Sequence, residues 1–121
     1  MANNDMDILI YKILRYLYEC MKNGKTPVLE DFSWDSKLMT IPKRYWMEIV
    51  ATLIEKGYIE GFAILRNRTK DVGLYIETDP PYKITYEGVG YLNTNSRMEK
   101  AKEFCGQAFI AVLSSLIGSI I

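Results

Sequence analysis

Histidine is absent from this sequence, cysteine occurs only twice, and the net charge is zero. Without histidine there is no Ser–His or Cys–His catalytic pair, and the distant Cys20 and Cys105 suggest two buried thiols rather than a disulfide framework or a zinc site. The Gly-Val-Gly run at 88–90 lacks the third glycine of a dinucleotide fingerprint, and no phosphate-binding loop ends in Gly-Lys-Ser/Thr. We therefore expect no enzyme activity, no cofactor, no metal ion and no small-molecule substrate.

A secretory signal and a global positive charge are also lacking. The first residues are polar and acidic and lead into no apolar run, so we expect a cytoplasmic protein. Fifteen basic residues balance fifteen acidic ones, which removes the positive field typical of nucleic-acid-binding domains. The charge is uneven, however: residues 1–36 carry −2, residues 37–70 carry +4 and residues 71–121 carry −2. An anionic partner would therefore meet the middle segment.

The residues that are present predict one small domain that begins with helices. The chain has 121 residues, 49% apolar and 25% charged, which is an ordinary composition for a protein with a single core. Over residues 5–21 apolar side chains recur at spacings of three and four, which predicts an amphipathic helix ended by Asn23-Gly24. Thr26 can cap a short second helix with Pro27 at its first position, running to about Phe32.

A third helix is predicted to begin between residues 40 and 42 and to end at Gly57, which suits the left-handed closing position. Its inward face consists of four apolar residues: Trp46, Ile49, Val50 and Leu53. Its outward face consists of Arg44, Glu48, Thr52 and Glu55. The two glutamates would face the phosphates of a nucleic acid, which argues against deep insertion of this helix into a major groove.

After the third helix the apolar period changes to two, which predicts a β-hairpin. Residues 58–65 and 72–77 are rich in β-branched and aromatic residues, and the polar stretch RNRTKD joins them. The TDPPYK segment that follows contains two prolines, which exclude a regular ladder. We therefore expect the second strand to end before this segment.

A fourth helix is predicted after the hairpin, with Thr85 as its cap. Gly88 and Gly90 each weaken this helix by roughly 1 kcal/mol relative to alanine, so packing must stabilise it. Tyr82 and Tyr86 are predicted to pack the hairpin onto the fourth helix.

Three helices followed by a two-stranded hairpin is the order of a winged helix-turn-helix. The segments EDF, LIEKGYIEG and KITYEGVGYLNTNS resemble the YjcQ-like winged-helix proteins of bacterial genomes and prophages, over roughly residues 6–100. The resemblance implies a compact winged-helix fold and a bacterial or phage origin, and it implies no particular activity. The expected class is thus α+β, mainly helical: a winged helix-turn-helix with an additional apolar C-terminal helix. Tyr86 departs from the family, where an acidic residue is common.

The basic residues of the middle segment are the candidate DNA contacts. Three of them lie within the five positions from Arg66 to Lys70, at the predicted hairpin tip, and two begin the third helix. The complete candidate set is Lys37, Lys43, Arg44, Arg66, Arg68 and Lys70. Two functions remain open: a non-catalytic DNA-binding or regulatory accessory factor, or a protein-interaction module that uses a winged-helix scaffold without DNA.

The C-terminal tail carries no charged side chain from Phe104 to Ile121. As one helix it would span about 27 Å, the borderline length for crossing a bilayer. Three hypotheses compete: a buried helix that packs on its own domain or on a partner, a membrane anchor, and a disordered, aggregation-prone end. We favour a homodimer, with residues 1–95 as a domain that has its own core and residues 96–121 as the dimerisation helix, over the membrane anchor. The candidate dimerisation residues are Phe109, Ala111, Val112, Leu113, Ser115, Leu116, Ser119 and Ile120.

Overall fold

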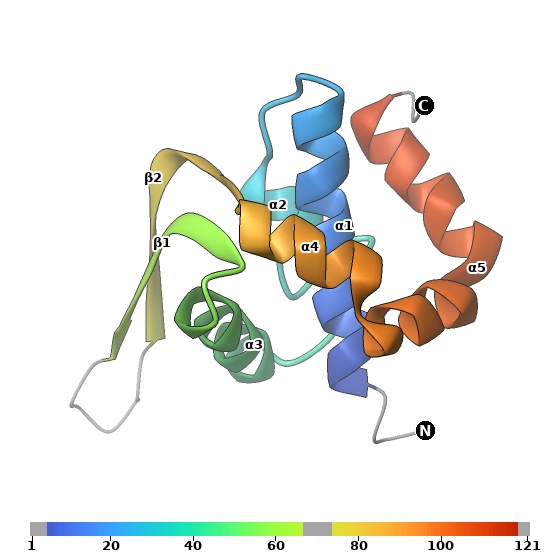
Figure 1. Ribbon diagram of the computed structural model, residues 1–121. Coiled ribbons are helices and arrows are strands. Elements are labelled where there is room, and N and C mark those ends of the chain that lie inside the picture. Colours follow the sequence, from blue (N-terminus) through green and yellow to red (C-terminus); the bar gives the residue numbers. More distant parts are fainter. Residues whose placement is uncertain (1–4, 67–73, 119–121) are drawn as a thin grey trace.

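The computed structural model describes residues 5–66 and 74–118, with five helices and two strands in these ranges (Figure 1). The elements are α1 (Asp5–Lys22), α2 (Leu29–Phe32), α3 (Lys43–Glu55), β1 (Ile59–Arg66), β2 (Leu74–Ile84), α4 (Tyr86–Thr94) and α5 (Ser96–Ile117). The protein is mainly helical with one small antiparallel sheet, which confirms the predicted α+β class. The winged-helix topology itself stays a prediction.

Helix α1 lies at the centre of the structure, and the other four helices and β2 all contact it (Figure 1). Its apolar side chains recur at helical spacing, and most of them are buried in the core, as the amphipathic pattern predicts. The buried apolar residues of α1 are Leu9, Ile10, Tyr11, Ile13, Leu14, Tyr16, Leu17 and Cys20. The prediction for this helix is confirmed, and the helix extends one residue further than expected.

Helix α2 is a single turn, and its predicted start is wrong. Val28 occupies the cap position without a side-chain hydrogen bond, so neither Thr26 nor Pro27 has the predicted role. The cause is tertiary: the Pro27 carbonyl accepts a hydrogen bond from the Tyr82 hydroxyl at 3.0 Å, and the Val28 N–H donates to the Tyr16 hydroxyl at 3.0 Å. Contacts with β2 and α1 hold this segment extended in place of an earlier helix start.

Phe32, at the end of α2, is the centre of an aromatic cluster. Its ring lies 5.3 Å from that of Tyr16, 6.2 Å from that of Trp46 and 6.1 Å from that of Tyr82. The indole N–H of Trp46 donates to the Phe32 carbonyl at 2.9 Å, so the cluster also satisfies the polar atom of a buried tryptophan. Helices α1, α2 and α3 and strand β2 therefore meet at one fully buried phenylalanine.

Tyr82 and Tyr86 do not join the hairpin to α4 as predicted. Tyr82 is buried against Phe32 and Phe62, and the Tyr86 side chain is 88% exposed. Tyr86 stands in the first turn of α4, on the side that faces away from the core, so the helical phase places it in solvent. The prediction for this pair is wrong.

Helix α3 has the predicted inward face, because Trp46, Ile49, Val50 and Leu53 are all buried. The helix begins at Lys43, immediately after Pro42, and its C-cap is Lys56. Gly57 follows with a φ of 77°, the left-handed conformation predicted for this glycine.

The β-hairpin is longer than predicted, because β2 continues through both prolines to Ile84. Pairing is antiparallel, and the register shifts between the pairs Glu60↔Lys83 and Phe62↔Thr78. The prolines lie inside this shift, where the ladder requires no N–H donor from them. Gly61 stands opposite the irregularity with a φ of 87°, so a glycine accommodates the bulge. The predicted interruption is present, but it bends the strand and does not end it.

The chain returns to the end of α3 at a junction formed by Gly57, Tyr58, Thr85, Gly88 and Tyr91, here called the Tyr58 junction. Thr85 caps α4, as predicted, by accepting from the Gly88 N–H at 3.0 Å, and its hydroxyl donates to the Gly57 carbonyl at 2.5 Å. The rings of Tyr58 and Tyr91 stack with centroids 4.5 Å apart. A Cβ at Gly88 would lie 2.2 Å from the Tyr58 carbonyl oxygen, so only glycine fits this close approach.

Helix α5 is bent at Gly106, whose φ of 59° and ψ of −153° are non-helical. The bend turns the second half of α5 back along α1 (Figure 1). Phe109, Leu113 and Ile117 are buried there in the same core as the earlier helices. Residues on both sides of position 95 therefore share one core. Within the described ranges, no helix combines the length and the apolar character that a membrane crossing requires.

Candidate nucleic-acid interface

The first turn of α3 presents two basic side chains to solvent, Lys43 and Arg44, and both are exposed. The Lys43 ammonium lies over the ring of Trp34, 5.1 Å from its centroid, and Trp34 packs edge-on against Trp46 at 5.4 Å. Trp34 is fixed in turn because its carbonyl accepts the Ile41 N–H at 2.9 Å. A cation–π contact on a fixed indole restricts Lys43 without removing its charge from solvent.

The hairpin that follows α3 projects from the helical body beside that helix (Figure 1). Arg66 is the last residue of β1 and pairs in register with Leu74. Arg68 and Lys70, the other two basic residues predicted at the tip, lie outside the described residues. The structure therefore places β1 beside α3, with the hairpin extending away from the helix, and leaves the tip contacts as a prediction.

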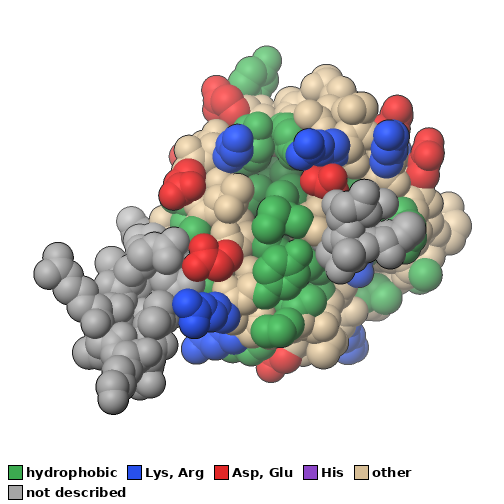
Figure 2. Space-filling model, turned by 90° about the horizontal axis from the view of Figure 1, so that it is seen from below, with side chains coloured by type: hydrophobic (Ala, Val, Ile, Leu, Met, Phe, Trp, Pro, Cys, Tyr) green, Lys and Arg blue, Asp and Glu red, His purple; other side chains and the backbone are tan. Residues whose placement is uncertain are grey.

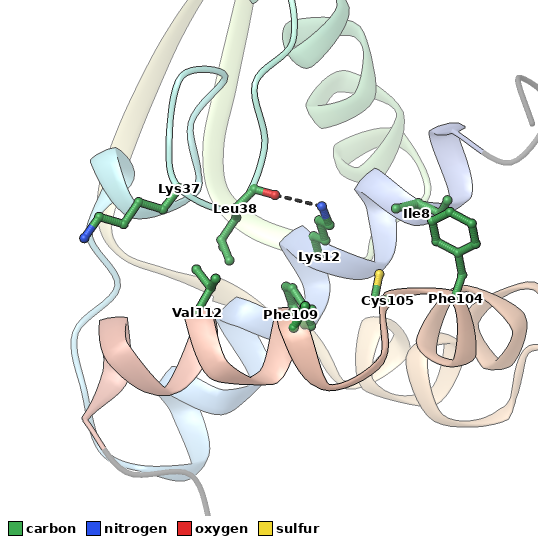
Figure 3. A pocket seen from close by; sticks show the side chains of 9 residues that line it. Ile8, Lys12, Lys37, Leu38, Phe104, Cys105, Phe109 and Val112 are labelled. Carbon is green, nitrogen blue, oxygen red and sulfur yellow. Dashed lines mark hydrogen bonds between the residues drawn. The ribbon is translucent and has the colours of Figure 1, made fainter.

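Lys37 belongs to a different part of the surface from the first turn of α3. It lies in the loop after α2 and lines a hollow between α1 and α5, together with Leu38 and Val112. Figure 3 shows its side chain directed away from the other residues of this hollow. The structure thus brings Lys43 and Arg44 together and separates Lys37 from them.

The acidic residues of α3 lie after its first turn. Glu55, at the last helical position, is exposed, and Glu48 is half-buried. Because both follow the basic turn, an approaching polyanion meets positive charge at the start of α3 and negative charge towards its end. This arrangement favours contact by the helix start over full insertion of the helix.

The candidate dimerisation residues do not form one exposed stripe. Phe109 and Leu113 are buried, and the Phe109 ring lies 5.4 Å from that of Tyr11 on α1. The side chains that remain exposed are those of Ala111 and Ser115, and Val112 and Leu116 are half-buried. Ser119 and Ile120 lie outside the described residues. The packing of Phe109 and Leu113 matches the hypothesis that the tail packs on its own domain, and homodimerisation through α5 stays a prediction.

A buried ion pair on α1 was not predicted. Glu19 is fully buried; it accepts from the Arg15 Nε at 2.7 Å and lies 3.3 Å from the Lys22 ammonium. Burial lowers the pKa of Arg15, but the hydrogen bonds to Glu19 and Tyr11 outweigh this and raise it above its ordinary value. The sequence signal was the spacing of Arg15 and Glu19, one helical turn apart. All three charged side chains belong to α1, and together with residues of α4 and α5 they line a hollow between these helices.

An apolar surface around Phe104 was also missed. Phe104 is 64% exposed, and together with Ile8 it lines three neighbouring hollows, here called the Phe104 groove. Figure 2, seen from the end where α1 begins, shows that hydrophobic and charged side chains are both exposed at this end of the molecule. The absence of charge in the tail led to predicted interface residues from Phe109 onwards. The open apolar surface instead forms where the start of α1 meets the first half of α5.

The cysteines differ in burial. Cys20 is fully buried, and Cys105 is half-buried and lines the Phe104 groove. Burial raises the pKa of both thiols above the ordinary value, and for Cys105 the nearby Lys12 partly opposes this. The expectation of two buried thiols is confirmed for Cys20 and only partly for Cys105. Among the described residues no three His, Cys, Asp or Glu side chains are placed to hold a metal ion.

These features define a mainly helical α+β protein in which a hairpin follows the third helix. The model of the YjcQ protein family matches residues 11–107, and the chain belongs to this family. No curated protein and no solved structure matches the chain. The predicted family resemblance is therefore confirmed.

The residues that carried the resemblance are packing residues. Asp31 of the EDF segment accepts a hydrogen bond from the Tyr16 hydroxyl at 2.9 Å, and Phe32 is the centre of the aromatic cluster. The other two segments meet each other at the Tyr58 junction. Each named contact joins two elements of this chain, so these three segments contribute to its fold.

Proposed function

We propose that this protein is a non-catalytic winged-helix protein of bacterial or phage type that binds DNA or acts as a regulatory accessory factor. The observation that carries the proposal is the exposed basic turn of Lys43 and Arg44 at the start of α3, with the β-hairpin directly after that helix. Duplex DNA attracts such a turn through its phosphates, and the start of a recognition helix is the part that reaches base edges.

In this proposal the two elements divide the contacts. The first turn of α3 approaches the major groove, where Arg44 can bond to guanine and the restricted Lys43 neutralises a phosphate. The hairpin contacts the neighbouring phosphate backbone of the DNA through Arg66, Arg68 and Lys70. The carboxylate of Glu55 limits how far α3 enters the groove.

The test is the salt dependence of duplex binding, measured by fluorescence anisotropy on a duplex of mixed sequence. We expect the double variant Arg66→Ala, Arg68→Ala to bind the duplex more weakly. The slope of log affinity against log salt concentration should become shallower by the amount that corresponds to about two lost phosphate contacts. Lys100→Ala with Lys102→Ala removes the same charge from α5 and serves as the matched control, with an unchanged slope. Equal slopes for the parent and the hairpin variant would remove the hairpin from the site.

A protein-interaction module on the same scaffold is the second candidate. The balance of 15 basic and 15 acidic residues favours it, because non-specific DNA binding draws on excess positive charge. Absence of any duplex binding by the parent protein at low salt would select this candidate.

We also propose a cytoplasmic protein that forms a homodimer through α5. The support for the dimer is that Ala111 and Ser115 are small and exposed on the second half of α5, where a second helix can approach closely. Light scattering of the full chain in water measures this directly, and a monomer at high concentration would contradict it.

A further inference from the structure

The Phe104 groove has a floor that is apolar and open. Phe104 and Ile8 line all three of its hollows, whose volumes are about 260, 200 and 450 Å³. Figure 3 shows Ile8 on α1 facing Phe104 on α5, with Cys105 beside them. Removing apolar surface from water is favourable, so an occupant that covered the exposed part of Phe104 would gain affinity from this residue.

The charged residues that line the groove are mostly basic. Four carry positive charge and one carries negative charge: Lys12, Lys37, Arg97, Lys100 and Asp7. Lys12 donates to the Leu38 carbonyl at 2.9 Å, which holds its stem along the wall of the groove. Within the described residues, Arg97 and Lys100 form no ion pair with a carboxylate, whereas the side chain of Lys37 is directed away from the other lining residues (Figure 3). An occupant with acidic flanks would therefore find basic groups that are not already neutralised.

This combination of an apolar floor and basic edges distinguishes between possible occupants. A second copy placed by twofold symmetry would bring the same net positive edge against itself, which is repulsive. Duplex DNA would meet the basic edges but would leave Phe104 and Ile8 without apolar contacts. Grooves between helices commonly receive one apolar face of an amphipathic helix. We propose that the Phe104 groove binds an amphipathic helix with acidic flanks from another protein, independently of any DNA contact.

The test uses a synthetic peptide as the probe. It has about 18 residues, or five helical turns, with leucines at positions i, i+3, i+4 and i+7 and glutamates on the other faces. Its fluorescence anisotropy is expected to rise and saturate on addition of the full-length protein. A second peptide has lysine in place of each glutamate, and a third keeps the glutamates but has serine in place of each leucine; neither is expected to saturate.

Variants of the protein identify the surface. Phe104→Ser is expected to weaken peptide binding roughly tenfold, as an interface anchor does. Tyr86→Ser removes an aromatic side chain that is 88% exposed and lines none of these hollows, so it is the matched control and should leave the affinity unchanged. Arg97→Glu with Lys100→Glu reverses two charges outside the DNA candidates, and should weaken the glutamate peptide while leaving duplex binding intact.

Cys105 provides an independent local measurement, because it lines the groove and Cys20 is fully buried. A saturating concentration of the glutamate peptide is expected to slow the alkylation of Cys105 by iodoacetamide. Mass spectrometry of the full chain measures the rate of this alkylation. An unchanged rate at saturation would show that the peptide binds elsewhere and would overturn the proposal.

Four other outcomes would also overturn it. The first two are no saturation up to about 1 mM peptide, and equal affinity for the lysine peptide. The third is a dimer in light scattering that Phe104→Ser dissociates, which would assign the groove to a second copy. The last is Phe104-dependent binding to vesicles of phosphatidylserine and phosphatidylcholine without peptide binding, which would assign it to a membrane surface.

Discussion

The Tyr58 junction and the Phe104 groove both join elements that are distant in the sequence, and they treat aromatic side chains in opposite ways. At the junction Tyr58 and Tyr91 stack at 4.5 Å, and Gly88 allows the backbones to meet. At the groove Phe104 is 64% exposed beside open hollows. The junction is built from the motifs that carried the family resemblance, and the groove lies mostly outside them. One region therefore fixes the fold, and the other leaves apolar surface exposed.

The largest effect is expected where α3 leads into the junction. Leu53 is buried at 1% exposure, and its carbonyl accepts the Tyr58 N–H at 3.0 Å. Leu53→Ala should lower the free energy of unfolding by about 2–5 kcal/mol, because it leaves a cavity below the junction. Urea denaturation measures the change. A denaturation midpoint close to that of the parent protein would show that the core beneath the Tyr58 junction is not tightly packed.

The two glycines of α4 should respond in opposite directions. Gly88→Ala should destabilise the protein by about 1–3 kcal/mol or more, because its Cβ would meet the Tyr58 carbonyl. Gly90 has open space around the same position, so Gly90→Ala should stabilise the protein by about 0.5–1 kcal/mol through helix propensity. Thermal unfolding of both variants measures their stability relative to the parent protein. Destabilisation by both substitutions would contradict the open space assigned to Gly90.

Alkaline pH should weaken the junction and leave the groove contacts of Phe104 unaffected. Burial raises the pKa of Tyr91 above its ordinary value near 10, so the folded state favours the neutral phenol. The associated stability is complete below the unfolded pKa and is lost as pH rises through the folded pKa. Tm should therefore stay level from neutral pH to about 9 and fall above about 10. Tyr91→Phe should fall less steeply than the parent, whose other buried tyrosines still titrate; equal slopes would contradict this assignment.

The smallest effect is expected at the groove. Phe104→Ser should change the free energy of unfolding by less than about 0.5 kcal/mol, since most of the ring is already in water. Chemical denaturation next to the parent checks this. A loss comparable to that of Leu53→Ala would mean that Phe104 supports the core and that the groove is closed in solution.

The sequence predicted the elements whose signal is local. The period of α1, the inward face of α3, Gly57 at its end and Thr85 at the start of α4 all follow from spacing or capping, and all are confirmed. The start of α2 and the course of β2 were not predictable from local signals. The hydrogen bond from the Tyr82 hydroxyl to the Pro27 carbonyl determines the first, and the bulge opposite Gly61 determines the second. Those partners are distant in sequence, and single-residue propensities do not contain them.

The candidate sites were predictable in part. The basic residues at the start of α3 can be identified from the sequence alone, and the structure shows that Lys43 and Arg44 are both exposed. The separation of Lys37 from them, and the Phe104 groove, depend on where the bent α5 packs along α1. Gly106 was the only local sign of that bend, and a single glycine in an apolar run is equally compatible with a straight helix.

The bend at Gly106 also bears on how the native structure opens. Its conformation is one that glycine alone tolerates, so the helical hydrogen-bond ladder is interrupted there and the two halves of α5 need not unfold together. The half after Gly106 packs along α1, and its buried side chains are those of Phe109, Leu113 and Ile117. Such a segment is a candidate cooperative unit in native-state hydrogen exchange, with its amides opening together at a lower free energy than those of α1. The protein would then release the second half of α5 while the aromatic cluster around Phe32 stays folded.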